Sequence, residues 1–139
     1  MSPTPHSVKV GDHLPQAVVT PTRAQLFLFS SATNNAHRIH YDRTWAVDVE
    51  GLADVVVHGP LQGALMAKVV TDWLGDDGRL IQSRVRHLKP AFPDDELVFD
   101  AEVTAVTHTE VSTTLDFEVV EVRDGEAIGR GWFVAVVGR

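Results

Sequence analysis

The stretch HGPLQGALMAKVVTDWLG, residues 58–75, decides the fold. Pro60 suits the first turn of a helix, because its missing N–H has no intrahelical partner there, and Gly75 is typical of a helix end. Apolar and small residues extend most of the way around the predicted helix 61–74, so we expect it to be buried on more than one side. Gly63 would let the backbone of a sheet approach closely. The stretch therefore predicts one long buried helix.

Strands dominate the chain after this helix. Two of them alternate apolar and polar residues, the pattern of a strand with one wet face, whereas the last is apolar at both parities, as in a central or interface strand. Strands joined by short turns are antiparallel, and one buried helix against an antiparallel sheet is an α+β arrangement. The predicted strands are residues 79–88, 96–106, 111–119 and 128–137, with turns at 107–109 and 124–125.

The chain before the helix is expected to be less regular. Thr22 can cap a helix that begins at Arg23, and Gly51 can close a short helix. The expected elements are an irregular lead-in at 1–15, a strand at 17–19, a helix from 23 to about 34–35, a polar loop at 36–42 and a short helix at 43–49.

Length and composition exclude several classes of protein. A chain of 139 residues fits one domain, 1–139. A net charge of -7 without a long Lys/Arg run argues against nucleic acid or an anionic membrane as a partner. Without cysteine there is no disulfide, thiolate nucleophile or cysteine zinc site. No stretch is long enough to span a bilayer and the start does not resemble a signal peptide, so we expect a cytoplasmic protein.

One polar segment, NNAHRIHYD at residues 34–42, groups several side chains that could do chemistry. Histidine can take or give a proton near neutral pH, although a loop of solvated histidines is the alternative. His37 and His40 are three residues apart, but no further ligand completes a recognisable metal spacing, so no metal site is expected.

A second segment, VVVHGPL at residues 55–61, leads into the central helix. The N–H groups of the first helical turn are free and favour negative charge. They could hold a carbonyl oxygen that becomes an oxyanion, and Gly59 leaves room for its approach. The alternative is a plain turn into a core helix.

Together, Ile39-His40-Tyr41-Asp42 and His58-Gly59-Pro60-Leu61 resemble the two motifs of the MaoC-like dehydratase family of hotdog proteins. The form of residues 35–42 is most similar to the type 2 hydroxyacyl-thioester dehydratase and mesaconyl-CoA hydratase branch. The resemblance is specific over residues 29–65 and looser to 106. It implies a hotdog domain, with an antiparallel sheet wrapped around the helix. It also implies a hydratase or dehydratase that interconverts a 2-enoyl and a 3-hydroxyacyl thioester on coenzyme A.

The resemblance also implies roles for single residues. His40 would be the catalytic base or acid, and the Gly59 N–H would hold the thioester carbonyl. Where the R-specific hydratases carry Asp five residues before this histidine, the chain has Asn35, which can orient a water through its carbonyl oxygen but cannot take a proton. His37 would supply a second proton-transfer group or a hydrogen bond. The expected substrate-contacting residues are His58, Gly59, Arg38, Tyr41, Arg86 and Lys89, the last two at the phosphates of coenzyme A.

The same resemblance bears on cofactors and partners. It implies no cofactor beyond coenzyme A as part of the substrate, with an acyl carrier protein as the other possible carrier. Because family active sites lie at or near subunit interfaces, it implies a homodimer or pairing with a related hotdog subunit.

Two rival functions remain at this stage. A hotdog thioesterase generally relies on an acidic residue near the central helix, but here the helix has Gln62 and no carboxylate before Asp72. A subunit of a heteromeric hydratase is the other rival, because residues 70–75 and the strands after them resemble the small subunit of actinobacterial steroid-degrading hydratases. Since the histidine motif is kept, we would expect this chain to be the catalytic partner of such a pair.

Overall fold

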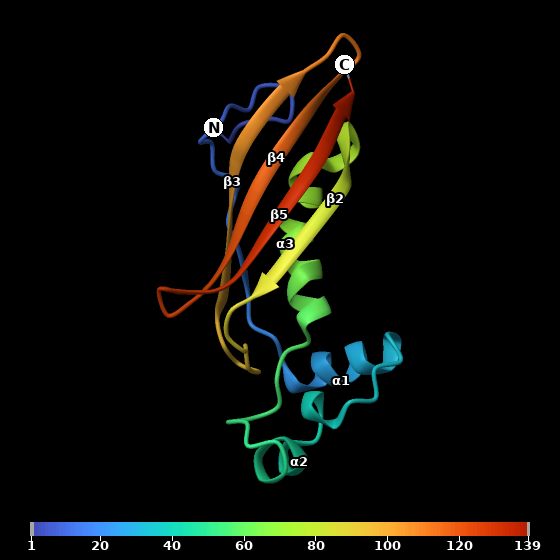
Figure 1. Cartoon of the computed structure of the whole chain (residues 1–139), viewed down its shortest axis with the longest axis vertical. Coiled ribbons are helices and arrows are strands. Elements are labelled where there is room, and N and C mark those ends of the chain that lie inside the picture. Colours follow the sequence, from blue (N-terminus) through green and yellow to red (C-terminus); the bar gives the residue numbers. More distant parts are fainter. Residues whose placement is uncertain (1, 139) are drawn as a thin grey trace.

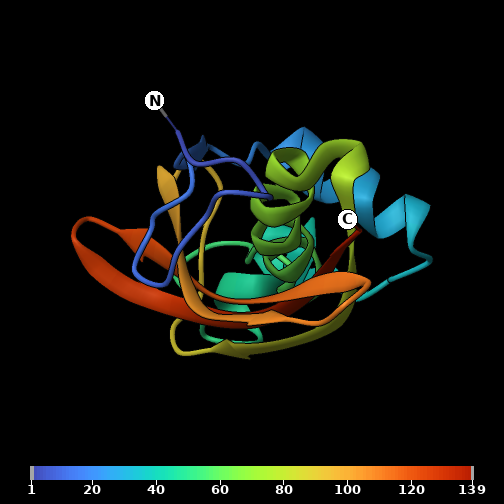
Figure 2. The same ribbon diagram turned by 90° about the horizontal axis from the view of Figure 1, so that it is seen from above.

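A computed structural model describes residues 2–138 of the chain. A five-stranded antiparallel sheet curves around one long helix, α3 (Gly59–Leu74). Figure 2 shows α3 lying in the hollow of the sheet, as the sequence predicts. The strands are β1 (Ala17–Val19), β2 (Gly78–His87), β3 (Leu97–His108), β4 (Ser112–Arg123) and β5 (Glu126–Gly138), in the spatial order β1-β3-β4-β5-β2.

The order of the strands places β2 at an edge of the sheet. Although β2 comes first after the helix, it pairs with β5 rather than with β3, its successor in the chain. Interruptions in strand register lie between Leu80 and Gln82 on β2 and between Val103 and Ala105 on β3. Such irregularities increase the local twist of a sheet, which helps this one to curve around α3.

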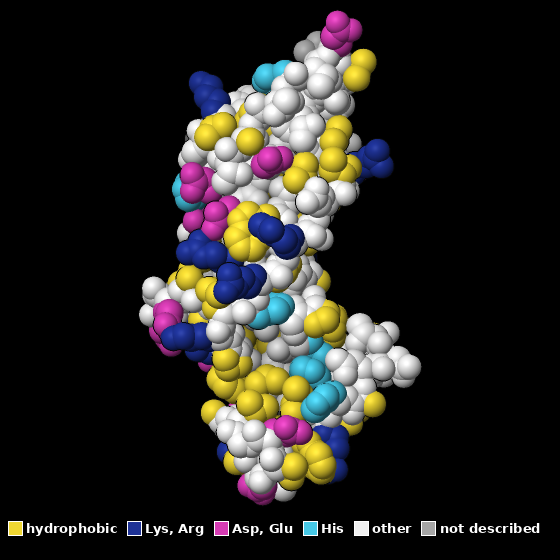
Figure 3. Space-filling view, in the orientation of Figure 1, with side chains coloured by type: hydrophobic (Ala, Val, Ile, Leu, Met, Phe, Trp, Pro, Cys, Tyr) yellow, Lys and Arg dark blue, Asp and Glu magenta, His cyan; other side chains and the backbone are white. Residues whose placement is uncertain are grey.

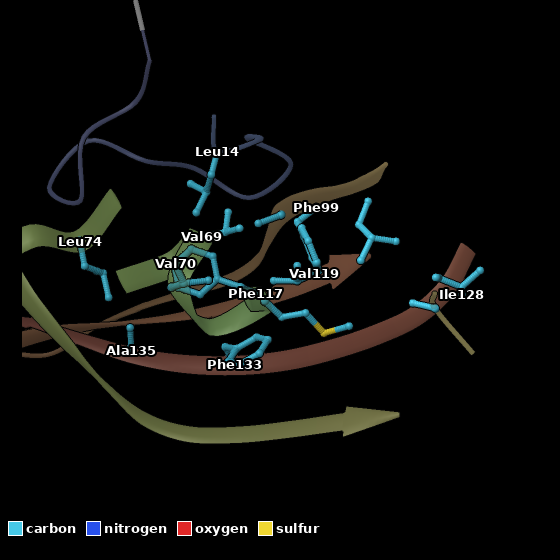
Figure 4. Close-up of a cluster of buried hydrophobic side chains, with 14 of the residues drawn as sticks. Leu14, Val69, Val70, Leu74, Phe99, Phe117, Val119, Ile128, Phe133 and Ala135 are labelled. Atoms are coloured by element: carbon cyan, nitrogen blue, oxygen red, sulfur yellow. The ribbon is translucent and has the colours of Figure 1, made fainter. Parts of the chain in front are cut away.

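The core lies between α3 and the concave face of the sheet. Phe99, Phe117 and Phe133 on three neighbouring strands are almost fully buried there, and Figure 4 shows them grouped with the side chains of Val69 and Val70 from α3. The positions of Phe99 and Phe117 follow the alternation predicted for 96–106 and 111–119. The apolar β5 lies between β4 and β2, so its prediction as a central strand is confirmed.

The remaining helices gather beyond one end of the sheet, near the start of α3 (Figure 1). Thr22 and Gln25 form a capping box at the start of the first of them, which explains why the chain turns into a helix there. The elements are α1 (Arg23–Ala32), the 3-10 helix η1 (Arg38–His40) and α2 (Arg43–Asp48); a further 3-10 turn, η2 (Gly75–Asp77), follows α3.

Several boundaries differ from the sequence prediction; β4, for example, extends to Arg123 rather than ending at 119. Helix α1 ends at Ala32 rather than near residues 34–35, because Asn34 takes a left-handed φ of 54°. The segment 36–42 is not wholly a loop but contains η1, in which the Ile39 N–H donates to the His37 side chain. Strand β3 continues into the predicted turn at 107–109 and ends at His108. None of the helices in residues 2–138 combines the length and the apolar character needed to cross a membrane.

Candidate active site

His40 is fixed where η1 meets the segment that leads into α3. The Val56 N–H donates to the Ile39 carbonyl at 2.9 Å, and the His40 Nδ1 lies 2.7 Å from the Val56 carbonyl oxygen. Because a carbonyl oxygen only accepts, Nδ1 carries the proton, and a neutral ring then has its free lone pair on Nε2. The local backbone thus selects a tautomer whose Nε2 is free to accept a hydrogen bond or a proton.

The imidazole of His58 stacks on that of His40. The ring centroids are 3.8 Å apart and the planes differ by 17°. His58 has no exposed surface, and its Nε2 is hydrogen-bonded to the Ser30 hydroxyl at 2.7 Å. Phe29 packs on the same ring, with centroids 4.7 Å apart. His58 is therefore fully buried behind His40 and is not among the residues that line the cavity beside His40.

Burial favours the neutral, unprotonated form of both stacked histidines. Burial lowers the pKa of His58 to about 4, with a further contribution from His40. Burial also lowers the pKa of His40, opposed by the Val56 hydrogen bond and assisted by His37. Two imidazolium ions stacked face to face would repel each other in a low-dielectric site. At neutral pH, His40 is thus available to accept a proton.

A cavity of about 450 Å³ opens beside His40. Gly59, at the first turn of α3, lies on its wall, so that the expected oxyanion donor and the expected base share one cavity. Gln62 also borders it, with its Nε2 donating to the Val57 carbonyl at 3.2 Å. The walls consist of Ile39, His40, Leu52, Val56, Val57, Gly59, Gln62, His87, Leu88, Lys89 and Pro90.

The structure does not bring Asn35 into this cavity. Asn35 lines a separate hollow of about 270 Å³ together with Ser30 and Tyr41. Its Oδ1 accepts from the His37 N–H at 3.1 Å, so the side chain stabilises the turn that precedes η1. The sequence expectation that Asn35 orients a water for His40 therefore finds no support in the geometry.

The other residues of the loop also have local partners. The Nδ1 of His37 lies 3.3 Å from the Ile39 N–H, and its ring centroid lies 6.1 Å from that of His40. Arg38 forms an ion pair with Asp42 and lies over the ring of Trp45 at 4.1 Å. The Tyr41 hydroxyl donates to the Ala36 carbonyl at 2.8 Å. None of these three side chains is among those that line the His40 cavity.

The two residues expected at the phosphates of coenzyme A lie differently. Lys89 is on the cavity wall and forms an ion pair with Glu126. Arg86 is on β2 between Val85 and His87, which face Gly63 and Gly59 of α3. Since side chains alternate along a strand, Arg86 points from the opposite, outer face. Figure 3 shows Lys and Arg side chains gathered on that face, near several histidines.

Sequence reasoning missed His87, the last residue of β2. Its imidazole borders the cavity, and its Nε2 lies 2.9 Å from the position that a Cβ of Gly59 would occupy. The alternation of side chains along the strand could have indicated it, because His87 is two residues after Val85 and so lies on the same inward face of β2. Within residues 2–138 no group of three or more His, Asp, Glu or Cys side chains is arranged to hold a metal ion.

The chain is similar in sequence to known thioester hydratases and dehydratases. A sequence model of the family described as hydroxyacyl-thioester dehydratase type 2 matches residues 2–93. The chain is 46% identical over 69 residues to a mesaconyl-C(4)-CoA hydratase of Chloroflexus aurantiacus, a match that covers 49% of this chain and 24% of the relative. It therefore spans about a quarter of that protein.

Two further matches cover a larger share of the matched protein. The 3-oxo-4,17-pregnadiene-20-carboxyl-CoA hydratase beta subunit of Mycobacterium tuberculosis is 30% identical over 97 residues, covering 70% of this chain and 74% of the relative. The solved structure of the R-hydratase PhaJ1 from Pseudomonas aeruginosa superposes with a TM-score of 0.83 at 19% identity, covering 95% of this chain and 83% of that one. At this identity the second match shows the hotdog fold alone.

Proposed function

Since this chain belongs to the hydroxyacyl-thioester dehydratase type 2 family, we propose that it adds water to a 2-enoyl thioester, or removes it from a 3-hydroxyacyl thioester. One observation carries the proposal: His40, with its Nδ1 bound to the Val56 carbonyl, shares a cavity with the first turn of α3 at Gly59. A base and an oxyanion donor on the walls of one cavity are what hydration of a conjugated thioester needs.

In the hydration direction, the thioester carbonyl oxygen accepts a hydrogen bond from the Gly59 N–H. This draws electrons from the double bond and makes C3 electrophilic. His40 Nε2 removes a proton from a water as its oxygen bonds to C3, and the C2–C3 π electrons move toward the carbonyl as an enolate. The protonated His40 then returns the proton to C2. Dehydration follows the same steps in reverse, and neither direction requires a cofactor.

We assign the whole proton transfer to His40. Asn35 and His37 were expected to share it, but Asn35 lines another hollow and the His37 Nδ1 is directed to the Ile39 N–H. Their proposed role is to hold the turn that carries His40. Arg38 and Tyr41 are likewise bound within the loop and are proposed to shape it rather than to touch the acyl group.

Coenzyme A is the proposed carrier, because the relatives from Chloroflexus aurantiacus and Mycobacterium tuberculosis are both named as hydratases of coenzyme A thioesters. Lys89, on the cavity wall, is the proposed contact for a phosphate. Arg86 lies on the outer face of the same edge strand, so it would meet only a carrier that passes around that edge. An acyl carrier protein is the alternative carrier.

We also propose that the chain works as a dimer, either with itself or with a related hotdog subunit. The ten-residue strand β2 forms an edge of the sheet, and most of its residues are exposed. An exposed edge of this length is able to pair with another strand. The mycobacterial relative is a beta subunit, which favours a heteromeric hydratase as the second candidate assembly.

The test is a panel of enoyl-CoA esters with short linear, branched, dicarboxylic and steroid acyl groups. Loss of the conjugated-alkene absorbance is followed together with release of free thiol. We expect alkene loss without thiol release. His40→Asn, whose amide can still donate to the Val56 carbonyl, should lose about 10²–10⁴-fold in rate with little change in stability.

His108→Asn provides the matched control, since His108 is exposed at the far end of β3 and hydrogen-bonds only to Thr113 in the described chain. It should retain wild-type turnover. Thiol release that persists in His40→Asn would replace the hydratase by a thioesterase. Turnover of His40→Asn at the wild-type rate would overturn the assignment of the base. Activity that appears only after a related hotdog subunit is added would establish the heteromeric candidate.

A further inference from the structure

His87 meets the central helix at the point where the substrate carbonyl is proposed to bind. It ends β2 and projects onto the inner face of the sheet, over the first residue of α3. A Cβ on Gly59 would lie 2.9 Å from His87 Nε2 and 3.2 Å from its Cδ2. The absent side chain of Gly59 therefore leaves room for an imidazole, and that imidazole borders the His40 cavity.

The distance between the two nitrogen atoms can be bounded. A Cβ lies about 2.5 Å from the backbone nitrogen of its own residue. His87 Nε2 and the Gly59 nitrogen are thus at most about 5.4 Å apart, so one oxygen atom can lie within about 3 Å of both. The two groups can converge on a single acceptor in the cavity.

We propose that His87 is a second catalytic donor: its Nε2–H binds the thioester carbonyl oxygen beside the Gly59 N–H. This inference rests on the proposed function and adds a residue to it. As water bonds to C3, negative charge moves onto that oxygen, and both N–H groups stabilise it. His87 keeps its proton throughout, whereas His40 removes the proton of the water and returns it to C2. The two histidines of the cavity therefore have separate tasks.

This division fits the surroundings of each ring. His40 is buried, and its Nδ1 is committed to the Val56 carbonyl, which leaves the acceptor Nε2 for the water. His87 is exposed on the strand side of the cavity and directs its Nε2 toward the start of α3. There the free N–H groups and the helix dipole already favour negative charge.

Two substitutions at this position separate a hydrogen-bond donor from a proton-transfer group. His87→Leu removes the donor with little change in size, and we expect kcat to fall about 10²–10³-fold. His87→Gln keeps an N–H donor but cannot transfer a proton at neutral pH, and it should recover at least about tenfold of that loss. Wild-type kcat in His87→Leu overturns the proposal. A His87→Gln variant as impaired as His87→Leu overturns the donor role as well.

Binding provides a readout independent of turnover. Calorimetry compares a saturated acyl-CoA thioester with the matching S-alkyl coenzyme A thioether, which lacks the carbonyl. The wild type should bind the thioester more tightly, and His87→Leu should reduce that preference, whereas His108→Leu should leave it unchanged. A preference that is equal in wild type and His87→Leu overturns the proposal even where the hydratase activity stands. A wild type inactive on the whole enoyl panel overturns the proposed function, and this inference with it.

Discussion

Glu121 places a carboxyl group inside the core, and its replacement by glutamine has a calculable effect. The residue lies on β4 with no exposed surface, and neither carboxylate oxygen has a hydrogen-bond partner in residues 2–138. Its Oε2 lies 2.6 Å from the position that a Cβ of Gly129 would occupy, beside Met66 of α3. Burial raises the pKa of Glu121 from 4.5 to about 7, against an opposing effect of Arg123.

The direction in which pH changes the free energy of unfolding follows from the number of protons bound in the folded and unfolded chains. Between pH 4.5 and about 7 the folded chain holds the Glu121 proton and the unfolded chain has released it. The contribution of Glu121 to the free energy of unfolding is therefore fully present below pH 4.5. It falls by about 1.4 kcal/mol per pH unit as the pH rises toward 7, for a total of roughly 3 kcal/mol.

The pH dependence of the free energy of unfolding of the wild type alone does not reveal this effect, because His58 changes that free energy in the opposite direction. Its pKa falls from 6.5 to about 4 on folding, so its contribution is lost as the pH falls through the same window. The difference between Glu121→Gln and wild type removes this background. Between pH 4.5 and pH 8 the free energy of unfolding of Glu121→Gln should rise by roughly 3 kcal/mol relative to that of the wild type. Burying the amide adds a term that does not depend on pH, so it does not change this difference.

Urea denaturation followed by tryptophan fluorescence at pH 5, 6, 7 and 8 measures the difference. The matched control is Glu110→Gln, because Glu110 is exposed in the turn between β3 and β4. The control should differ from wild type by the same amount at every pH. A difference for Glu121→Gln that is equally flat would refute the reasoning, since it would mean that the folded protein already holds this carboxyl group ionised at pH 5.

Three further results are expected around the cavity. Ser30→Ala removes the hydroxyl group that is hydrogen-bonded to buried His58 and should lower the free energy of unfolding by about 1–3 kcal/mol. An unchanged urea midpoint would contradict a contribution of this hydrogen bond to stability. Gly59→Ala places a methyl group 2.9 Å from His87 Nε2, so activity should fall sharply while stability changes little, and full activity would show that this approach is not used. Because burial lowers the pKa of His40, kcat/KM should hold as the pH falls to about 6.5 and decline only below it, whereas an acidic limb above neutrality would exclude His40 as the base.

The fold could be predicted because its signals are local and agree with one another. The capping box at Thr22, the proline at the start of α3 and the glycine at its end each act within one turn of helix. The strand alternation records which face is buried and is read directly from residues 97–103. The pairing of β2 with β5 depends instead on contacts distant in sequence, so the sequence predicted the strand without its place in the sheet.

The candidate site was predicted only in part, because a motif gives positions in the chain and not side-chain directions. Asn35 and His40 are five residues apart, yet the left-handed Asn34 and the turn after it place them in different hollows. His58 and Gly59 are neighbours, but one is buried behind the base and the other lines the cavity. Only the packing of α1, η1 and α3 against one another decides these outcomes.

The stacked histidines explain how the buried imidazole of His40 would act as the proposed base. Water-exposed His40 would hold its proton through a larger part of the acidic range, and its ring could rotate. Val56 prevents rotation by accepting from Nδ1, and Ser30 fixes His58 behind it. When His40 takes a proton from water, the charge is created beside a ring whose pKa of about 4 keeps it neutral, in a site that solvates the charge poorly. The same burial that keeps His40 unprotonated before the reaction would therefore favour return of the proton to carbon, so that the site is suited to holding one proton briefly.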